Sequence, residues 1–197
     1  MNVPAPWRLG TLAPKPGDPM RYRLSWVRDS RHGEAPVVAG VVMYNPALEG
    51  ELVGYRCTAE NGTIIESVPL IRDGATHRRV RSLLSDFTEI RVANLSPIRG
   101  TKPRDARRAD ELTCADPVIM EQQRDAIRWA CAADVVIAAW GGDPMTETMT
   151  AHRDYVLHRC RDRLKCWGTT AKGAPLHPSP LGRIPKDATL QPYRSTT

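Results

Sequence analysis

The chain has 197 residues, a length suited to one domain of ordinary size with its own hydrophobic core. Hydrophobic residues make up 41% of it and the formal net charge is +6, but no apolar run approaches the roughly 20 residues that cross a bilayer. The first 20 residues are rich in proline and lack the apolar stretch of a signal peptide, so the sequence excludes a membrane-spanning protein and predicts a cytoplasmic one.

The excess positive charge lies in one window of the chain. Between Ile71 and Arg108, ten Lys or Arg residues stand against four acidic ones, so this window carries the whole excess. Such a concentration favours a polyanionic partner, of which nucleic acid is the commonest, and a solvated arginine-rich surface is the alternative. The five cysteines are odd in number and form no C-x-x-C pair, which predicts reduced, mostly buried thiols and neither a metal site nor a cofactor.

A single domain is expected over residues 21–183. It is preceded by a poorly structured arm over 1–20 and followed by a polar tail over 184–197. Apolar, mostly β-branched runs predict strands at 37–44, 89–95, 134–140 and 163–168. Helical periodicity predicts helices at about 75–84, 117–133 and 146–162, and the stretch 47–70 is less regular, with short strands or a loop as the options.

The clearest of these helices begins at Pro117. Asp116 can cap it, and proline suits the first helical position. Its expected inner residues are Val118, Met120, Ile127, Trp129, Ala130 and Ala133. Strands that alternate with helices predict an α/β fold, as a three-layer α/β/α sandwich with a central, mostly parallel four-stranded sheet.

Polar residues follow the predicted strands. Asn45-Pro46 comes after the first strand, Asn94 closes the second, Gly141-Gly142 follows the third, and His177 comes after the fourth and a short turn. Ligands of open α/β sheets gather at the carboxyl ends of the strands. We therefore expect these groups to converge on one edge of the sheet.

The hexapeptide His177-Pro178-Ser179-Pro180-Leu181-Gly182 combines three kinds of chemistry. Histidine exchanges a proton near neutral pH, the prolines restrict the backbone, and leucine is a bulky apolar side chain in a loop. This combination suits an enzyme that wedges open a base stack and acts on the base that it extrudes. An ordinary proline-rich turn is the alternative.

With these motifs in this order, residues 37–183 resemble the uracil-DNA glycosylase superfamily. There, a motif after the first strand carries a water-positioning Asp or Asn before proline, and the mismatch-specific branch has Gly-Ile-Asn-Pro-Gly, similar to Met43-Tyr44-Asn45-Pro46-Ala47 here. The classical His-Pro-Ser-Pro-Leu-Ser motif is matched from His177 to Gly182 with only the last residue changed. Asn94 takes the place of the asparagine that recognises the base.

The chain also resembles a little-studied family known only as a domain of unknown function. The resembling segments are Arg21-Tyr22-Arg23-Leu24-Ser25, Val92-Ala93-Asn94-Leu95, Ala139-Trp140-Gly141 and Gly168-Thr169-Thr170-Ala171-Lys172-Gly173. That family typically lacks the Ser-Pro-Leu part of the histidine motif. The chain departs from the classical glycosylases in having no carboxylate at Asn45, and its cysteines do not match the iron–sulfur branches.

The resemblance implies a monofunctional DNA glycosylase that flips out and excises a uracil-like, thymine-like or modified pyrimidine base, in repair or in defence against modified phage DNA. Asn45, which would position the water, and His177, which would stabilise the departing base, are the expected catalytic residues. The expected substrate-binding residues are Tyr44, Pro46, Tyr55, Asn94, Ser179 and Leu181. The expected contacts with the DNA backbone are Arg78, Arg99, Lys102 and Arg183.

Several alternatives stay open. A nearby carboxylate, Glu49, Glu51 or Asp143, could act as the base in place of Asn45. The chain could instead be a catalytically inactive DNA-binding protein of the same fold, or an enzyme that acts on free nucleosides or nucleotides. The expected partner is double-stranded DNA, with single-stranded DNA as a second possibility. A monomer that contacts no membrane is expected, because a duplex must reach the edge of the sheet.

Overall fold

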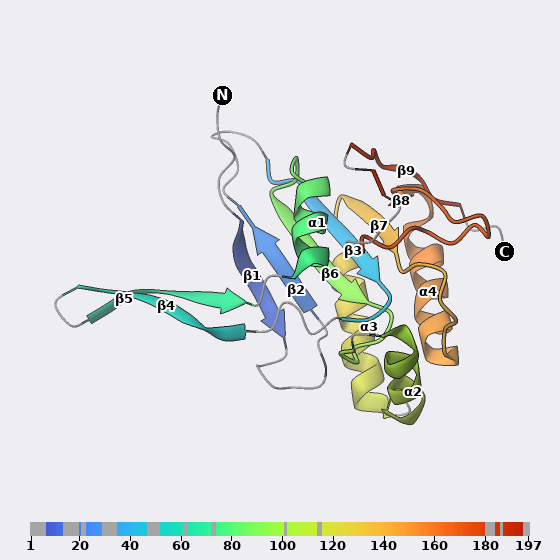
Figure 1. Cartoon of the computed structure of the whole chain (residues 1–197), viewed down its shortest axis with the longest axis horizontal. Coiled ribbons are helices and arrows are strands. Elements are labelled where there is room, and N and C mark those ends of the chain that lie inside the picture. Colours follow the sequence, from blue (N-terminus) through green and yellow to red (C-terminus); the bar gives the residue numbers. More distant parts are fainter. Residues whose placement is uncertain are drawn as a thin grey trace.

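The computed structural model describes residues 7–13, 20, 23–28, 35–46, 52–60, 63–71, 74–100, 102–113, 116–179, 184–185 and 187–194. Within them the chain forms a mixed α/β fold around a seven-stranded sheet of order β1-β2-β6-β3-β7-β8-β9 (Figure 1). The strands of this sheet are β1 (Arg8–Ala13), β2 (Arg23–Val27), β3 (Val38–Met43), β6 (Glu89–Asn94), β7 (Val135–Ala139), β8 (Leu164–Cys166) and β9 (Gln191–Pro192).

The four strands predicted from the sequence are β3, β6, β7 and β8, and they pair in parallel. The prediction of a four-stranded sheet is too small, because three further strands extend it to seven. Strands β2 and β1 add to β6 in antiparallel fashion, and β9 adds antiparallel to β8. Antiparallel strands need no continuous apolar run, so β1 and β9 gave no such signal in the terminal segments 1–20 and 184–197.

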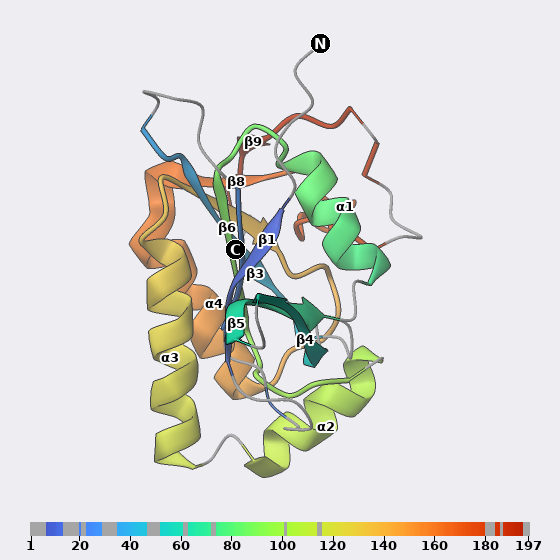
Figure 2. The ribbon, with the colours of Figure 1, turned by 90° about the vertical axis from the view of Figure 1, so that its left-hand side faces the viewer.

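The described part of the chain forms four helices: α1 (Ala75–Leu83), α2 (Pro103–Thr113), α3 (Pro117–Cys131) and α4 (Glu147–Cys160). α1 packs on one face of the sheet, α3 and α4 pack on the other, and α2 lies at the carboxyl ends of the strands (Figure 2). α1, α3 and α4 match the predicted helices, whereas α2 was not predicted. The sheet has a hydrophobic core on each face, and successive side chains of β3 point into opposite cores. Val42 belongs to the core under α3 and α4, and Val41 to the core under α1. A 3₁₀ turn, η1 (Arg161–Arg163), leads from α4 into β8.

Helix α3 begins as the sequence predicted, because the Asp116 side chain accepts a hydrogen bond of 2.8 Å from the Val118 N–H. Its buried stripe agrees with the prediction at Ile127, Ala130 and Ala133 but differs at its start. Val118 is 64% exposed, and Gln123 is fully buried together with Ala126, Ile127 and Ala130. The buried positions follow the i, i+3, i+4, i+7 spacing from Gln123, which turns Val118 towards solvent.

Helix α3 lies unusually close to β3 at Gly40. A methyl group on Gly40 would overlap the carbonyl group of Ala130, so only glycine fits this position. On the same side of the sheet, Cys131 of α3 and Cys160 of α4 are free and buried, as is Cys166 of β8. The prediction of reduced, buried cysteines is confirmed for these three.

Strands β4 (Leu52–Glu60) and β5 (Thr63–Ile71) pair as an antiparallel hairpin in the stretch for which the sequence left strands or a loop open. The hairpin projects from the body of the molecule (Figure 1). None of the helices in the described part of the chain is long and apolar enough to span a membrane.

Candidate functional site

The carboxyl ends of β3, β6, β7 and β8 meet at one edge of the sheet, which we call the carboxyl edge. The register places Met43, the last residue of β3, beside Asn94 on one side and Ala139 on the other. Asn45 follows Met43 by two residues, and Gly141 follows Ala139 by two. The predicted convergence on one edge thus has a backbone basis in the sheet.

Asn45 lies in the turn after β3 and is half-buried. Its Nδ2 donates hydrogen bonds to the carbonyl oxygens of Gly100, at 3.0 Å, and Pro46, at 3.2 Å. The Gly100 N–H in turn donates to the carbonyl of the buried Pro46 at 3.0 Å. The amide nitrogen therefore ties this turn to the segment after β6, while Oδ1 is the acceptor that Asn45 can offer to a ligand or a water.

Asn94 closes β6 and is 1% exposed. Its backbone carbonyl accepts a hydrogen bond from Nε2 of Gln123 on α3, whereas its side-chain Oδ1 has no hydrogen-bond partner among the described residues. Because side chains alternate along a strand, Asn94 shares the α1 face of the sheet with Ile90 and Val92. A buried acceptor without a partner is rare in native proteins and marks a candidate ligand site.

His177 lies beside the end of β7: a methyl group on Gly141 would lie 3.5 Å from His177 Cβ. Burial lowers the pKa of His177 below its ordinary value of 6.5, and the nearby Asp143 carboxylate opposes this shift. The ring is therefore neutral at physiological pH, with one N–H donor and one acceptor. Leu176, which directly precedes His177, packs with the core under α1, on the face that carries Asn94, as does Ile184.

The remaining residues of the histidine motif are only partly described. Pro178 is buried and Ser179 is half-buried. The predicted residues Leu181 and Arg183 lie outside the described part, as do Glu49 and Glu51. Of the three alternative carboxylates, the described part thus includes Asp143, which is exposed and acts electrostatically on His177.

Tyr44 is placed differently from the other predicted substrate-binding residues. It is 2% exposed within the core under α3 and α4, and its hydroxyl group donates a hydrogen bond to the Pro144 carbonyl. Burial raises the pKa of this hydroxyl, and Asp143 adds to the rise while Arg107 opposes it. Tyr44 therefore ties the turn after β3 to the segment before α4. Tyr55 lies in β4, and its side chain is outside the described part.

Two buried polar residues that the sequence analysis did not single out, Gln123 and His152, contact backbone carbonyl groups at the end of β6. Besides Gln123, His152 of α4 is 4% exposed, and its Nδ1 lies 2.8 Å from the Leu95 carbonyl. This carbonyl can only accept, so Nδ1 carries the proton. Each helix thus holds one carbonyl at the end of β6. The sequence signal for such a supporting residue is a polar residue within a buried helical stripe, such as His152 between Met149 and Val156.

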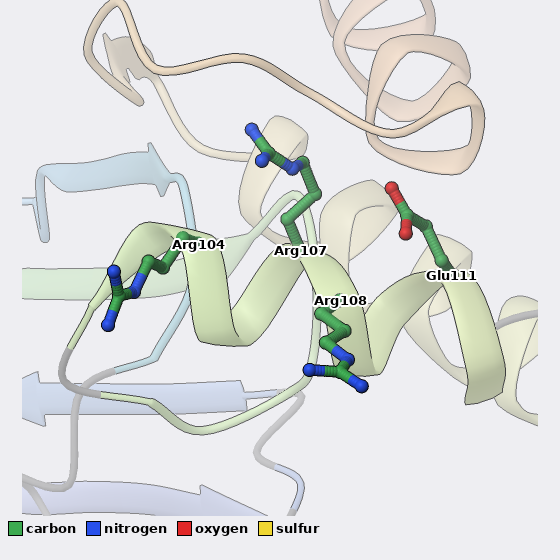
Figure 3. Close-up of a pocket in the computed structure, with 4 residues that line it drawn as sticks. All are labelled: Arg104, Arg107, Arg108 and Glu111. Atoms are coloured by element: carbon green, nitrogen blue, oxygen red, sulfur yellow. The ribbon is translucent and has the colours of Figure 1, made fainter.

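Helix α2 lies beside the carboxyl edge and carries part of the basic window. Its Asp110 is buried and accepts a hydrogen bond of 2.6 Å from the Thr146 hydroxyl group, which also caps α4. A concavity of about 510 Å³ is lined by Arg104, Arg107, Arg108 and Glu111 (Figure 3). Of the predicted backbone contacts, Arg99 is half-buried and Lys102 exposed just before α2, and Arg78 is exposed on α1.

A second concavity, of about 340 Å³, opens beside the carboxyl end of β7. Its lining consists of Trp140, Gly141, Gly142, Asp143, Pro144, Met145, Thr150, Arg153, Lys172, Gly173, Ala174 and Tyr193. Trp140 itself is 2% exposed and packs edge-on against Tyr193, as expected for a core aromatic residue. The alternative carboxylate Asp143 thus lies at a hollow next to His177.

No curated protein and no solved structure matches the chain. One family model matches residues 69–179. This range includes the helices α1 to α4, the strands β6, β7 and β8, and the first part of the histidine motif, from His177 to Ser179. Its description is that of a protein of unknown function, DUF1643. Because the match covers more than half of the 197 residues, the chain belongs to the DUF1643 family.

Proposed function

We propose that this protein is a monofunctional DNA glycosylase of the uracil-DNA glycosylase type, which extrudes a pyrimidine base from DNA and hydrolyses its N-glycosidic bond. The observation that carries the proposal is the Oδ1 atom of Asn94, which is buried at the carboxyl edge and has no hydrogen-bond partner among the described residues. An N–H group on the edge of a flipped pyrimidine would supply the missing donor. The segment that bears His177 packs on the same face of the sheet.

The residues at this edge suit the charges of such a reaction. Breaking the glycosidic bond leaves positive charge on the sugar and negative charge on the base, which a well-placed donor stabilises. Neutral His177 can donate an N–H to the developing oxyanion. Asn45 can orient the attacking water through Oδ1, but an amide does not take the proton at neutral pH. Leaving-group stabilisation therefore contributes most, and Asp143 is the carboxylate placed near His177.

The proposal is tested by base release from labelled duplex and single-stranded DNAs, followed by alkali to cleave abasic sites. The panel contains uracil, thymine opposite guanine, hydroxymethyluracil, hydroxymethylcytosine and glucosylated cytosine. We expect release of at least one base by the wild-type protein. His177→Ala should lower the rate by roughly 10²–10³-fold, the usual effect of removing one oxyanion donor.

His158→Ala is the matched control, because His158 is an exposed histidine near the end of α4 and should leave the rate unchanged. Full turnover in His177→Ala would contradict the proposed role of the imidazole. Absence of release across the panel with tight DNA binding would favour an inactive DNA-binding protein. Absence of both release and binding would favour an enzyme of free nucleosides or nucleotides.

A further inference from the structure

Helix α2 presents a stripe of arginines on the side opposite its buried face. Arg104, Arg107 and Arg108 stand at positions i, i+3 and i+4, and Glu111 at i+7, so the four side chains share one face of the helix. They line the 510 Å³ concavity. Figure 3 shows Arg107 and Glu111 directed to one side of this face and Arg104 and Arg108 to the other. We call these three arginines the α2 stripe.

Among the described side chains of α2, two are acidic. Asp110 is 1% exposed and its carboxylate is turned inward to the Thr146 hydroxyl group. Of the described residues that line the concavity, Glu111 is acidic and three are arginines. The exposed Lys102 adds a further positive charge just before the helix.

The helix is fixed beside the candidate site. The Asp110–Thr146 hydrogen bond joins α2 to the first turn of α4, and the segment before α2 is held to the turn after β3 by the hydrogen bond from Asn45 to Gly100. The positive charge of Arg107 opposes the rise in the pKa of Tyr44, which follows β3 at the carboxyl edge. These two hydrogen bonds fix the position of the α2 stripe relative to that edge.

We propose that the α2 stripe binds neighbouring phosphates of the DNA strand whose base enters the carboxyl edge; that this strand is DNA rests on the proposed function. Guanidinium groups match phosphate oxygens with paired N–H donors. Residues four apart are separated by about 6 Å along a helix axis, and phosphates of one strand follow each other every 3.4 Å along a duplex, so the stripe is long enough for two of them.

The test measures the affinity for a fluorescent duplex as a function of salt between 50 and 200 mM, for the wild type, Arg107→Gln, Arg108→Gln and the double variant. One lost phosphate contact should lower the slope of log K against log salt by about 0.9, which is roughly a threefold difference over this range. The double variant should show about twice the change in slope. Arg124→Gln and Arg128→Gln are matched controls, because both are exposed arginines of α3 that pair with Glu121.

Wild-type affinity and slope in the stripe variants would overturn the proposal, even if the wild type releases a base. A reduced slope in the stripe variants and an unchanged slope in the controls would support it, even if no base is released by the wild type. In that second case the glycosylase activity fails and the phosphate contact stands. An equal reduction in stripe and control variants would also overturn it, because it would show a diffuse charge effect.

Discussion

At the end of β6, one residue has two different hydrogen-bonding roles. The backbone carbonyl of Asn94 is held by Gln123, while its side-chain Oδ1 is buried with no partner among the described residues. Leaving a buried acceptor unsatisfied costs about 1–3 kcal/mol. A ligand that donates a hydrogen bond to this atom would remove that cost, so the free protein is less stable at Asn94 than its ligand-bound form.

Replacing this amide should therefore separate stability from activity. Asn94→Leu keeps a similar volume and removes the unsatisfied acceptor, so we expect the free energy of unfolding to stay the same or to rise, by up to about 2 kcal/mol. Base release should be lost in the same variant. Urea unfolding and the release assay measure the two effects. Unfolding at clearly lower urea than the wild type would mean that the amide stabilises the free protein.

At the scale of the elements, the packing of α3 on β3 controls the position of Gln123. The backbone of Gly40 lies so close to Ala130 that an added methyl group would overlap the Ala130 carbonyl. Gln123 lies two turns before Ala130 on the same buried stripe. Any outward shift of α3 would therefore also move the side chain that holds the carbonyl of Asn94.

We accordingly expect Gly40→Ala to lower the free energy of unfolding by roughly 3 kcal/mol, the upper part of the range for overpacked cores. Urea unfolding followed by far-UV circular dichroism measures this change. Gly100→Ala is the matched control, because the nearest atoms to its added methyl group would lie at an ordinary 3.6 Å. Equal stability of the two variants would contradict the close contact between β3 and α3.

The sequence predicts those elements whose signal is local. The run from Val37 to Tyr44 shows a strand buried on both faces, and Asp116-Pro117 shows where α3 begins. Helix α2 was missed because its arginines hide its helical pattern, and its inner positions are held by Ala106 and by the polar Asp110. Asp110 is an inner residue whose carboxylate is satisfied by a tertiary partner, the Thr146 hydroxyl group.

In the candidate site, too, the sequence predicts what depends on local signals and misses what depends on tertiary contacts. Asn45, Asn94 and His177 could be placed at one edge because strand ends are visible in the sequence. The hydrogen bonds that occupy the Asn45 amide nitrogen depend on Gly100, which is distant along the chain. The supporting roles of Gln123 and His152 likewise depend on carbonyl groups that any residue carries. The acceptor side of such contacts leaves no residue-type signal, and the donor side leaves only a polar residue within a buried stripe, as at His152.

For the whole molecule, two histidines with a lowered pKa, His152 and His177, couple folding to pH. Burial lowers the pKa of both His152 and His177 in the folded state. Around His152, the Leu95 carbonyl and Asp110 oppose the shift, and Arg124 adds to it. The unfolded chain therefore binds protons more readily than the folded one, and stability rises with pH between the lowered values and the ordinary 6.5.

We expect the full contribution of these histidines above about pH 6.5 and a progressive loss of stability as the pH falls below it. Urea unfolding at several pH values between 5 and 8 measures this dependence. His152→Gln should make it shallower, since glutamine can still donate to the Leu95 carbonyl without titrating. A stability that rises as the pH falls below 6.5 would contradict the direction of both shifts.

The position of β6 between β2 and β3 has a consequence for the order in which the protein assembles. Strand β2 joins the sheet only through β6, with Leu24 opposite Val92, while β1 covers its other edge. A ribosome therefore releases β1 and β2 long before their partner strand has been synthesised. Until β6 emerges, the inner edge of β2 offers unpaired backbone groups to any passing strand. During this interval the edge of β2 is open to mispairing in the nascent chain.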